Sequence, residues 1–283
     1  MDNILSLHQD LKNKTYKHGP YHAFNISDPK PRNIHKAFVR DRLLHHAIYR
    51  VFYPYFDKKF ISDSYSCRLN KGTHKALEQF KKYARKVSKN NTKQCWILKC
   101  DIKKFFASID HPLLQLTVVR SLKDPDTNWL ISQIITSFHT SLGKGLPLGN
   151  LTSQLLVNIY MNEFDQFVKH KLKAKHYIRY ADDFVFLSHD INYLCTIYQY
   201  IVHFLENHLK LKLHPDKVFI KTFASGVDFL GWIHFPNHRV LRTTTKRRML
   251  KNLSLNPARE STASYLGFLK HGNTYKIRRS FDV

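Results

Sequence analysis

The sequence has few acidic residues, few cysteines and no long apolar run. No stretch approaches the roughly 18 apolar residues that a membrane-spanning helix needs, and the segment from Met1 to Leu5 does not resemble a signal peptide. We therefore expect a cytoplasmic protein with no membrane partner. The cysteines form no CxxC pair and are predicted to be reduced packing residues: Cys67, Cys95, Cys100 and Cys195.

Basic and aromatic residues are abundant instead. Lysine and arginine number 46 against 21 aspartates and glutamates, so the formal net charge is +25. Such an excess opposes compaction unless a polyanion is close by. Its interleaving with Tyr, Phe and His favours nucleic acid, although a merely soluble protein or one that binds anionic membranes stays open. The 18 histidines are scattered, which favours solvated or phosphate-facing imidazoles over a zinc site.

The first part of the chain is predicted to be an arm followed by helices. Residues 1–31 are polar and interrupted by glycine and proline, so we expect an extended arm with ordered structure beginning near Arg32. From Ile34 to Phe56 the apolar residues recur at helical spacing. The polar loop from Ser62 to Gly72 could hold a phosphate chain or be a solvated turn. Thr73 to Val87 is predicted to be a second, basic helix.

Strands and helices alternate along the rest of the chain, and no segment repeats at a fixed period. The glycine-rich stretch at 143–150 lacks the Gly-Lys-Ser/Thr of a phosphate-binding P-loop. The pattern predicts, in order, a buried strand at Cys95–Asp101, a helix from Pro112, a helix at Leu151–His170, strands at His176–Tyr180 and Phe184–Ser188, a helix at Tyr193–Leu209 and a hairpin at Val227–Phe235.

Asp182 and Asp183 are adjacent between two β-prone runs, which is costly because close carboxylates repel each other and burial disfavours their charged forms. A bound cation removes that cost. Asp101, also at a strand end, can complete an oxygen-ligand site for Mg²⁺, and two ions about 3.5–4 Å apart would suit in-line phosphoryl transfer. An ordinary acidic turn is the alternative interpretation.

Three motifs together resemble those of reverse transcriptases over most of the chain, from about Arg32 to Lys276. They are Asp101 followed by Phe105-Phe106, Leu146-Pro147-Leu148-Gly149 followed by Ser153-Gln154, and Tyr180-Ala181-Asp182-Asp183. The resemblance implies an α+β right-hand polymerase with helical fingers, an antiparallel-sheet palm and a short helical thumb. We expect an N-terminal arm at 1–31, interleaved fingers and palm at 32–240, and a basic thumb at 241–283.

The resemblance also implies roles in catalysis. It makes Asp101, Asp182 and Asp183 the ligands of two Mg²⁺ ions, for which Mn²⁺ could substitute, with the backbone carbonyl of Ile102 nearby. Lys217 is similar to a later lysine of the family and is a candidate to protonate the leaving pyrophosphate. A solvated lysine is an equal alternative at that position.

Residues of the nucleotide site are implied in the same way. Phe106 would pack under the deoxyribose, because an aromatic ring against the 2′ position leaves no room for a ribose hydroxyl, whereas Phe105 is expected in the core. Arg68 and Lys71 lie where the fingers of the family clamp the incoming triphosphate. The loop residues Leu148 and Gly149 are expected beside the nucleotide.

The predicted template-primer contacts lie late in the chain. Phe229-Leu230-Gly231-Trp232 resembles a primer-grip hairpin, in which glycine permits close approach of the primer backbone. A basic helix would hold the duplex through its phosphates, using Arg242, Lys246, Arg247 and Arg248. The chain ends soon after Gly267, so no RNase H or endonuclease domain is expected.

Leu148 points to a subtype. Relatives of the group II intron type mostly carry glutamine there, and the stretch from Leu148 to Gln154 resembles diversity-generating retroelement reverse transcriptases, which copy template RNA with errors at adenines. Leucine cannot supply the amide hydrogen bonds that help to fix the incoming nucleotide, so we predict low fidelity. That resemblance alone implies a small basic accessory variability determinant as partner.

The expected function is therefore RNA-directed DNA synthesis from dNTPs, on an RNA template with a DNA or RNA primer. A free-standing phage-defence or retron-type reverse transcriptase is the enzyme alternative, with the same three aspartates and a different template. An RNA-binding splicing or packaging factor without polymerase activity is the alternative from another class. The complete set Asp101, Asp182 and Asp183 argues against that factor.

Overall fold

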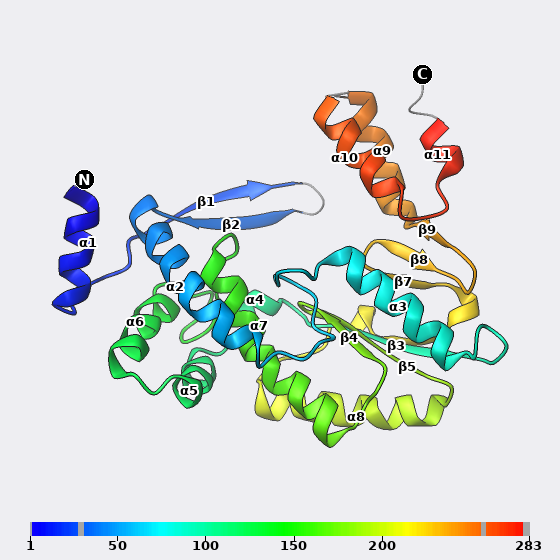
Figure 1. Ribbon diagram of the computed structural model, residues 1–283, viewed down its shortest axis with the longest axis horizontal. Coiled ribbons are helices and arrows are strands. Elements are labelled where there is room, and N and C mark those ends of the chain that lie inside the picture. Colours follow the sequence, from blue (N-terminus) through cyan, green and yellow to red (C-terminus); the bar gives the residue numbers. More distant parts are fainter. Residues whose placement is uncertain (1, 28–30, 256–258, 280–283) are drawn as a thin grey trace.

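The computed structural model describes residues 2–27, 31–255 and 259–279, and at its centre is a four-stranded antiparallel sheet of order β4-β5-β3-β6 (Figure 1). The predicted strands at Cys95–Asp101, His176–Tyr180 and Phe184–Ser188 are confirmed to within one residue at each end. The observed strands are β3 Trp96–Asp101, β4 Tyr177–Tyr180, β5 Asp183–Ser188 and β6 Phe219–Thr222.

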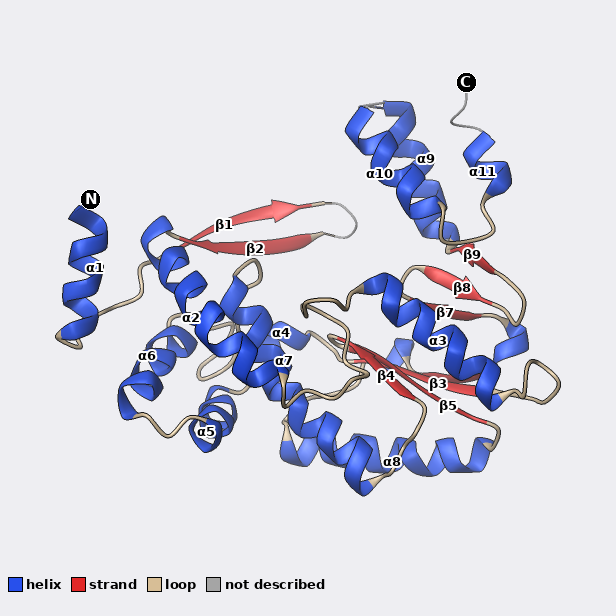
Figure 2. Ribbon diagram, in the orientation of Figure 1, coloured by secondary structure: helices blue, strands red, loops and turns tan. Residues whose placement is uncertain are grey.

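Both faces of this sheet are covered by helices (Figure 2). Side chains alternate between the two faces of a strand: Leu98 and Cys100 of β3 belong to the core on the side of α8 (Ile191–His208). Ile97 belongs to the second core, beneath α3 (Thr73–Val87). Burial on both faces explains why these strands are almost continuously apolar. The predicted bounds of α3 are confirmed residue for residue.

The remaining helices pack around α7, which is buried along most of its length. Helices α2 and α5 both contact it. The predicted helices from Pro112 and from Leu151 are confirmed, and the second continues beyond Gln166 as a π-helical turn. The bounds are α2 Val39–Asp57, α4 Phe105–Ser108, α5 His111–Ser121, α6 Pro125–Thr136 and α7 Leu151–Gln166, with the π-helical turn Phe167–Lys171.

The prediction of an extended arm at 1–31 is wrong. Helix α1 (Asp2–Lys12) and strand β1 (Tyr21–Ile26) are formed there, and β1 pairs with β2 (Arg32–Ala37) in antiparallel register. Consequently α2 begins at Val39 and not at Ile34. The segment between α1 and β1 is anchored by Tyr16, which is 1% exposed and donates a 2.8 Å hydrogen bond to the buried carboxylate of Asp41.

The C-terminal part consists of a small sheet and three helices, which rise from the sheet in Figure 1. The hairpin predicted at Val227–Phe235 and the basic helix are confirmed. The elements are β7 Val227–Phe229, β8 Trp232–His234, β9 Arg239–Leu241, α9 Thr243–Leu255, α10 Arg259–Leu269 and α11 Tyr275–Arg279. Short 3-10 turns at Pro215–Lys217 and Phe223–Ser225 flank β6.

All four cysteines are free, but only two of them pack in the core as predicted. Cys95 and Cys100 are buried, and burial raises the pKa of the Cys95 thiol to about 12. Cys67 and Cys195 are exposed, because they lie in a loop and on the outer face of an amphipathic helix. Among the residues that the structure describes, no helix is long and apolar enough to cross a bilayer.

Candidate active site

The three predicted aspartates meet at one end of the four-stranded sheet. Asp101, the last residue of β3, lies directly opposite Asp183, the first residue of β5. Asp182 lies in the turn between β4 and β5, and its carbonyl accepts a 3.1 Å hydrogen bond from the backbone N–H of Ile102. Ala181 makes this tight turn possible by adopting the left-handed conformation, with φ of 55°.

Burial and the neighbouring carboxylates both raise the pKa values of Asp182 and Asp183. Burial, opposed by the charge of Lys99 and aided by Asp101 and Asp182, raises the pKa of Asp183 to about 7. Burial and then the charge of Asp101 likewise raise the pKa of Asp182. The Oδ1 atom of Asp183 is buried without a hydrogen-bond partner. The site is therefore short of positive charge.

Two lysines supply part of that charge. Nζ of Lys217 lies 2.8 Å from Oδ1 of Asp101, and Nζ of Lys99 lies 3.4 Å from Oδ2 of Asp183. Lys99 was not among the predicted site residues. Its signal in the sequence is a lysine two residues before Asp101 in an otherwise apolar strand, because this spacing places both side chains on one face.

The donor set fits divalent metal ions. Carboxylate oxygens, with a backbone carbonyl nearby at Ile102, are the ligands that Mg²⁺ prefers, and Asp183 offers a buried oxygen that lacks a partner. Within residues 2–27, 31–255 and 259–279, no three His, Cys, Asp or Glu side chains already converge around one point as a metal site.

A buried arginine fixes the turn that carries the aspartates. Arg179, which is 0% exposed, donates to both carboxylate oxygens of Asp165 on α7 at 2.8 and 2.6 Å. It also donates to the carbonyl of Ala181 at 3.2 Å and to Oγ of Ser64 at 3.1 Å. Sequence reasoning missed this residue, although an arginine inside a buried strand is itself unusual.

The β1–β2 hairpin reaches the site as well. Burial raises the pKa of Asp182, and the positive charge of Arg32, the first residue of β2, is one of the influences that oppose this rise. Arg32 itself is exposed. Local sequence around Arg32 predicts only the start of ordered structure, because the position of this residue depends on the pairing of β2 with β1.

The loop that carries Leu148 is fastened to the same hairpin. The carbonyl of Leu148 accepts a 2.9 Å hydrogen bond from the N–H of His35, and the Asn150 side chain bonds the backbone of His35 and Ala37 at 2.7 and 3.1 Å. Gly149 has φ of 103°, and a Cβ there would lie 2.5 Å from Cγ2 of Ile34. Only glycine fits this approach.

Phe106 is joined to the start of this loop. It is half-buried, and its carbonyl accepts a 2.9 Å hydrogen bond from the N–H of Leu146. The neighbouring Phe105 is 4% exposed and belongs to the core, as predicted. The half-buried ring of Phe106 leaves room for contact with a sugar, and that role stays a prediction.

The proposed triphosphate clamp is turned inward. The Arg68 guanidinium is hydrogen-bonded to the carboxylate of Asp57 and to the carbonyls of Ile61 and Ser64. Nζ of Lys71 donates to the carbonyl of Ser62 at 2.6 Å, and burial lowers its pKa. In this conformation both side chains brace the loop at 62–72: the Arg68 side chain is 5% exposed and held inward, whereas Lys71 is partly exposed, and its contact with a triphosphate stays a prediction.

The hairpin predicted to grip the primer divides into two parts. Phe229 and Trp232 are 0% exposed and pack in the core, so their side chains are covered in this conformation, and contact of this hairpin with the primer stays a prediction. Leu230 and Gly231 form the partly exposed tip, with φ of 50° and 85°. Alternation explains the difference, because the flanking side chains of β7 and β8 point toward α3.

The basic thumb residues also differ from one another. Arg242 lies just before α9 and is hydrogen-bonded to Asp228, so its charge is already paired. Lys246 and Arg247 are exposed on α9, where they can meet phosphates, while Arg248 is half-buried.

A mixed fold with an antiparallel sheet that gathers three aspartates beside basic helices defines a palm-type nucleotidyl-transfer polymerase. A family model described as reverse transcriptase (RNA-dependent DNA polymerase) matches residues 25–234. The chain belongs to this family, whose enzyme class is RNA-directed DNA polymerase.

Individual relatives agree with this assignment. The chain is 26% identical to Protein YkfC of Escherichia coli, with 91% of this chain and 75% of that protein covered. It is 23% identical to the group II intron-encoded protein LtrA of Lactococcus lactis, covering 87% of this chain and 51% of LtrA. An apo telomerase structure from Candida tropicalis superposes with a TM-score of 0.58 at 12% identity, over 85% of this chain and 60% of the telomerase. The predicted fold class is confirmed.

Proposed function

We propose that this chain synthesises DNA on an RNA template by nucleotidyl transfer at Asp101, Asp182 and Asp183. The observation that carries the proposal is the register of β3 against β5, which sets Asp101 opposite Asp183 beside the Asp182 turn. The substrates would be dNTPs, with an RNA template and a DNA or RNA primer. The net charge of +25 supports a nucleic-acid partner.

The three carboxylates and the carbonyl of Ile102 would hold two Mg²⁺ ions, for which Mn²⁺ could substitute. When bound, such ions stabilise the attacking and leaving oxygens of the displacement. Lys217 contacts Asp101 at 2.8 Å, so it stands close enough to deliver a proton to a leaving pyrophosphate. Arg32 would approach the triphosphate, and Phe106 would contact the sugar.

Primer extension on a defined RNA template tests the proposal. With Mg²⁺ and dNTPs, the wild-type chain is expected to extend a DNA primer, whereas Asp182→Asn loses extension by about 10³-fold or more. Glu206→Gln, an exposed carboxylate on α8, is the matched control and retains activity. If wild type and Asp182→Asn bind the primer-template equally and neither extends it, the chain is an RNA-binding factor and the proposal is wrong.

We further propose that synthesis is error-prone, as in diversity-generating retroelements. Support comes from the Leu148 side chain, which offers no hydrogen bond where glutamine would, in a loop held by His35 and Asn150. A small basic accessory protein would be the partner. Sequencing of cDNA tests the idea: Leu148→Gln is expected to lower misincorporation opposite template adenines, and an unchanged error spectrum would reject low fidelity through Leu148.

A reverse transcriptase of ordinary fidelity is the second candidate. The similarity to LtrA, a group II intron-encoded protein, favours it. The same cDNA sequencing distinguishes the candidates, because an enzyme of this kind would show no excess of errors opposite adenines in the wild-type chain.

A further inference from the structure

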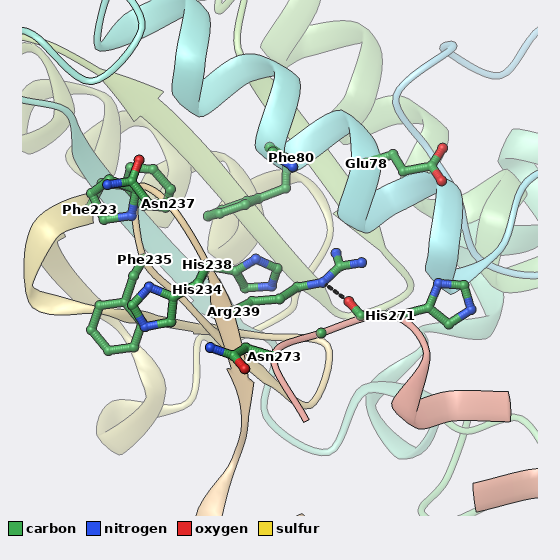
Figure 3. A pocket seen from close by; sticks show the side chains of 13 residues that line it. Glu78, Phe80, Phe223, His234, Phe235, Asn237, His238, Arg239, His271 and Asn273 are labelled. Atoms are coloured by element: carbon green, nitrogen blue, oxygen red, sulfur yellow. Dashed lines mark hydrogen bonds between the residues drawn. The ribbon is translucent and has the colours of Figure 1, made fainter. Parts of the chain in front are cut away.

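A second cavity lies away from the aspartates, between α3, the β8–β9 sheet and the connection from α10 to α11. Its volume is about 460 Å³, which falls within the usual range for a small-ligand site. We call it the α3–β9 pocket; its lining includes Phe80, His234, Phe235, His238, Arg239 and His271. Figure 3 shows side chains from all three parts converging on this space.

The α3–β9 pocket is separate from the active site. Phe223, which lines it, donates its backbone N–H to the carbonyl of Cys95, just before β3. Asp101 is at the other end of that strand. At roughly 3.3 Å per residue, the separation along β3 is about 16 Å or more. A ligand in the pocket would not touch the aspartates.

Aromatic rings form the walls of the pocket. Phe235 and His238 are stacked with their ring centroids 4.9 Å apart, and His234 lies 4.6 Å from Phe80. Burial lowers the pKa of His234 to about 4, so this imidazole is neutral at physiological pH. Flat rings at an accessible surface provide a stacking platform for a nucleobase.

The guanidinium of Arg239 brings positive charge to the pocket. Arg239 donates through Nε to the carbonyl of His271, and among the described residues no carboxylate forms a salt bridge with it. Burial lowers its pKa, and the charge of Glu78 opposes this only in part. In Figure 3 the terminal nitrogens of Arg239 lie on the side of the pocket that faces Glu78.

The walls are held in place before any ligand arrives. A Cβ on Gly272 would lie 2.0 Å from the ring of Trp232, so the segment before α11 is seated directly on that ring. The N–H of Asn273 donates to the carbonyl of Arg239 at 2.8 Å. On the opposite side, the Asn91 side chain ties the turn at Pro236 and Asn237. Such preorganisation reduces the entropy lost on binding.

We propose that the α3–β9 pocket binds one nucleotide of a single-stranded RNA, with its base against the Phe235–His238 rings and its phosphate at Arg239. A strand is favoured over a free nucleotide because Lys81, which lines the pocket, is exposed, and the exposed Lys82 and Lys270 are the chain neighbours of the lining residues Lys81 and His271. These cations could meet neighbouring phosphates. The pocket thereby anchors RNA at a second point, away from the site of synthesis.

Equilibrium binding tests the anchor without using catalysis. The probe is a fluorescent single-stranded RNA of about 16 nucleotides, and its anisotropy is titrated with the Asp182→Asn chain in the absence of dNTPs. Adding His238→Ala is expected to weaken binding about fivefold or more, because a stacked ring is lost. His238→Phe keeps the ring and retains affinity. The control His203→Ala removes an exposed histidine from α8 and leaves binding unchanged.

Arg239→Met adds an independent measurement. Loss of one phosphate contact is expected to lower the slope of log K against log salt by about one. The proposal would be overturned if His238→Ala bound the RNA with the same affinity as the parent chain and Arg239→Met showed the same salt slope as the parent chain. So would binding of AMP as tight as that of the RNA, since the pocket would then be a free-nucleotide site.

Crosslinking locates the contact directly. RNA that carries 4-thiouridine, irradiated with the wild-type chain, is expected to give adducts on Phe235 or His238 by mass spectrometry. Adducts confined to other surfaces would reject the assignment. Because neither binding nor crosslinking requires polymerisation, a failure of this proposal is distinguishable from a failure of the proposed polymerase activity.

Discussion

Asp101 and Asp183 are direct partners across the β3–β5 ladder, and Asp183 retains a buried carboxylate oxygen without a hydrogen bond. The antiparallel pairing holds the two carboxylates together whether or not a cation is present. The fold therefore carries a standing electrostatic cost at this site, which metal binding would relieve. The first prediction follows from this relationship.

Asp182→Asn is expected to leave the metal-free chain as stable as wild type or more stable, because it removes one of three mutually repelling carboxylates. Mg²⁺ at saturating concentration should stabilise wild type by about 1–3 kcal/mol and the variant much less. Thermal unfolding with and without Mg²⁺ measures both effects. Equal stabilisation of the two proteins by Mg²⁺ would contradict a metal site that includes Asp182.

Arg179→Met should be severely destabilising. It leaves Asp165 as an unpaired buried carboxylate, at a cost of about 3–5 kcal/mol. The double variant with Asp165→Leu should recover most of the stability but not the extension rate, because the Ala181 carbonyl still lacks its donor. Urea unfolding and primer extension are compared for the three proteins. Full activity in the double variant would show that Arg179 has no positioning role.

Gly149→Ala tests the attachment of the Leu148 loop to the hairpin. The added Cβ would meet Ile34 at 2.5 Å and would be strained at φ of 103°, so we expect a loss of about 1–3 kcal/mol. Ile34→Ala in the same chain should relieve the contact but not the backbone strain, and thus restore part of the stability. A double-mutant cycle by urea unfolding measures the coupling; additive effects would show that the two residues do not touch.

The buried His45 predicts an acid-sensitive fold. Burial, above all, lowers its pKa to about 4, whereas the unfolded chain binds the proton near pH 6.5. Since the unfolded state then carries more protons, stability should fall as pH decreases from about 6.5 to about 4, by up to about 3 kcal/mol. Urea unfolding across this range should show a shallower dependence for His45→Gln. The control His46→Gln replaces an exposed neighbour and should follow wild type.

Much of the fold was predictable from local pattern. The strand that ends at Asp101, the Tyr180–Asp183 turn and the helix Thr73–Val87 are each specified by residues next to one another. The aspartate site was predictable for the same reason, since each of its motifs is a short contiguous stretch that is defined by its residue types.

Other features depend on distant partners, and local pattern could not show them. Residues 21–26 form a strand only because residues 32–37 pair with them, and the same pairing brings Arg32 toward Asp182. Likewise, the apolar pattern around Gly231 predicted a hairpin but not that Phe229 would be covered by Phe80 of α3 and Trp232 by Phe268 of α10.

The sequence by itself thus determined the class of chemistry, because the short motifs that carry the three aspartates are those of the reverse transcriptase family. Tertiary structure alone decided that Lys99 and Arg179 support the aspartates and that the charge of Arg32 acts on Asp182, and it showed that the predicted Lys217 pairs with Asp101. It also decided that Arg68 braces a loop and that rings and a guanidinium converge in the α3–β9 pocket. The physical reason is that pairing register and burial are properties of contacts between segments far apart in the chain.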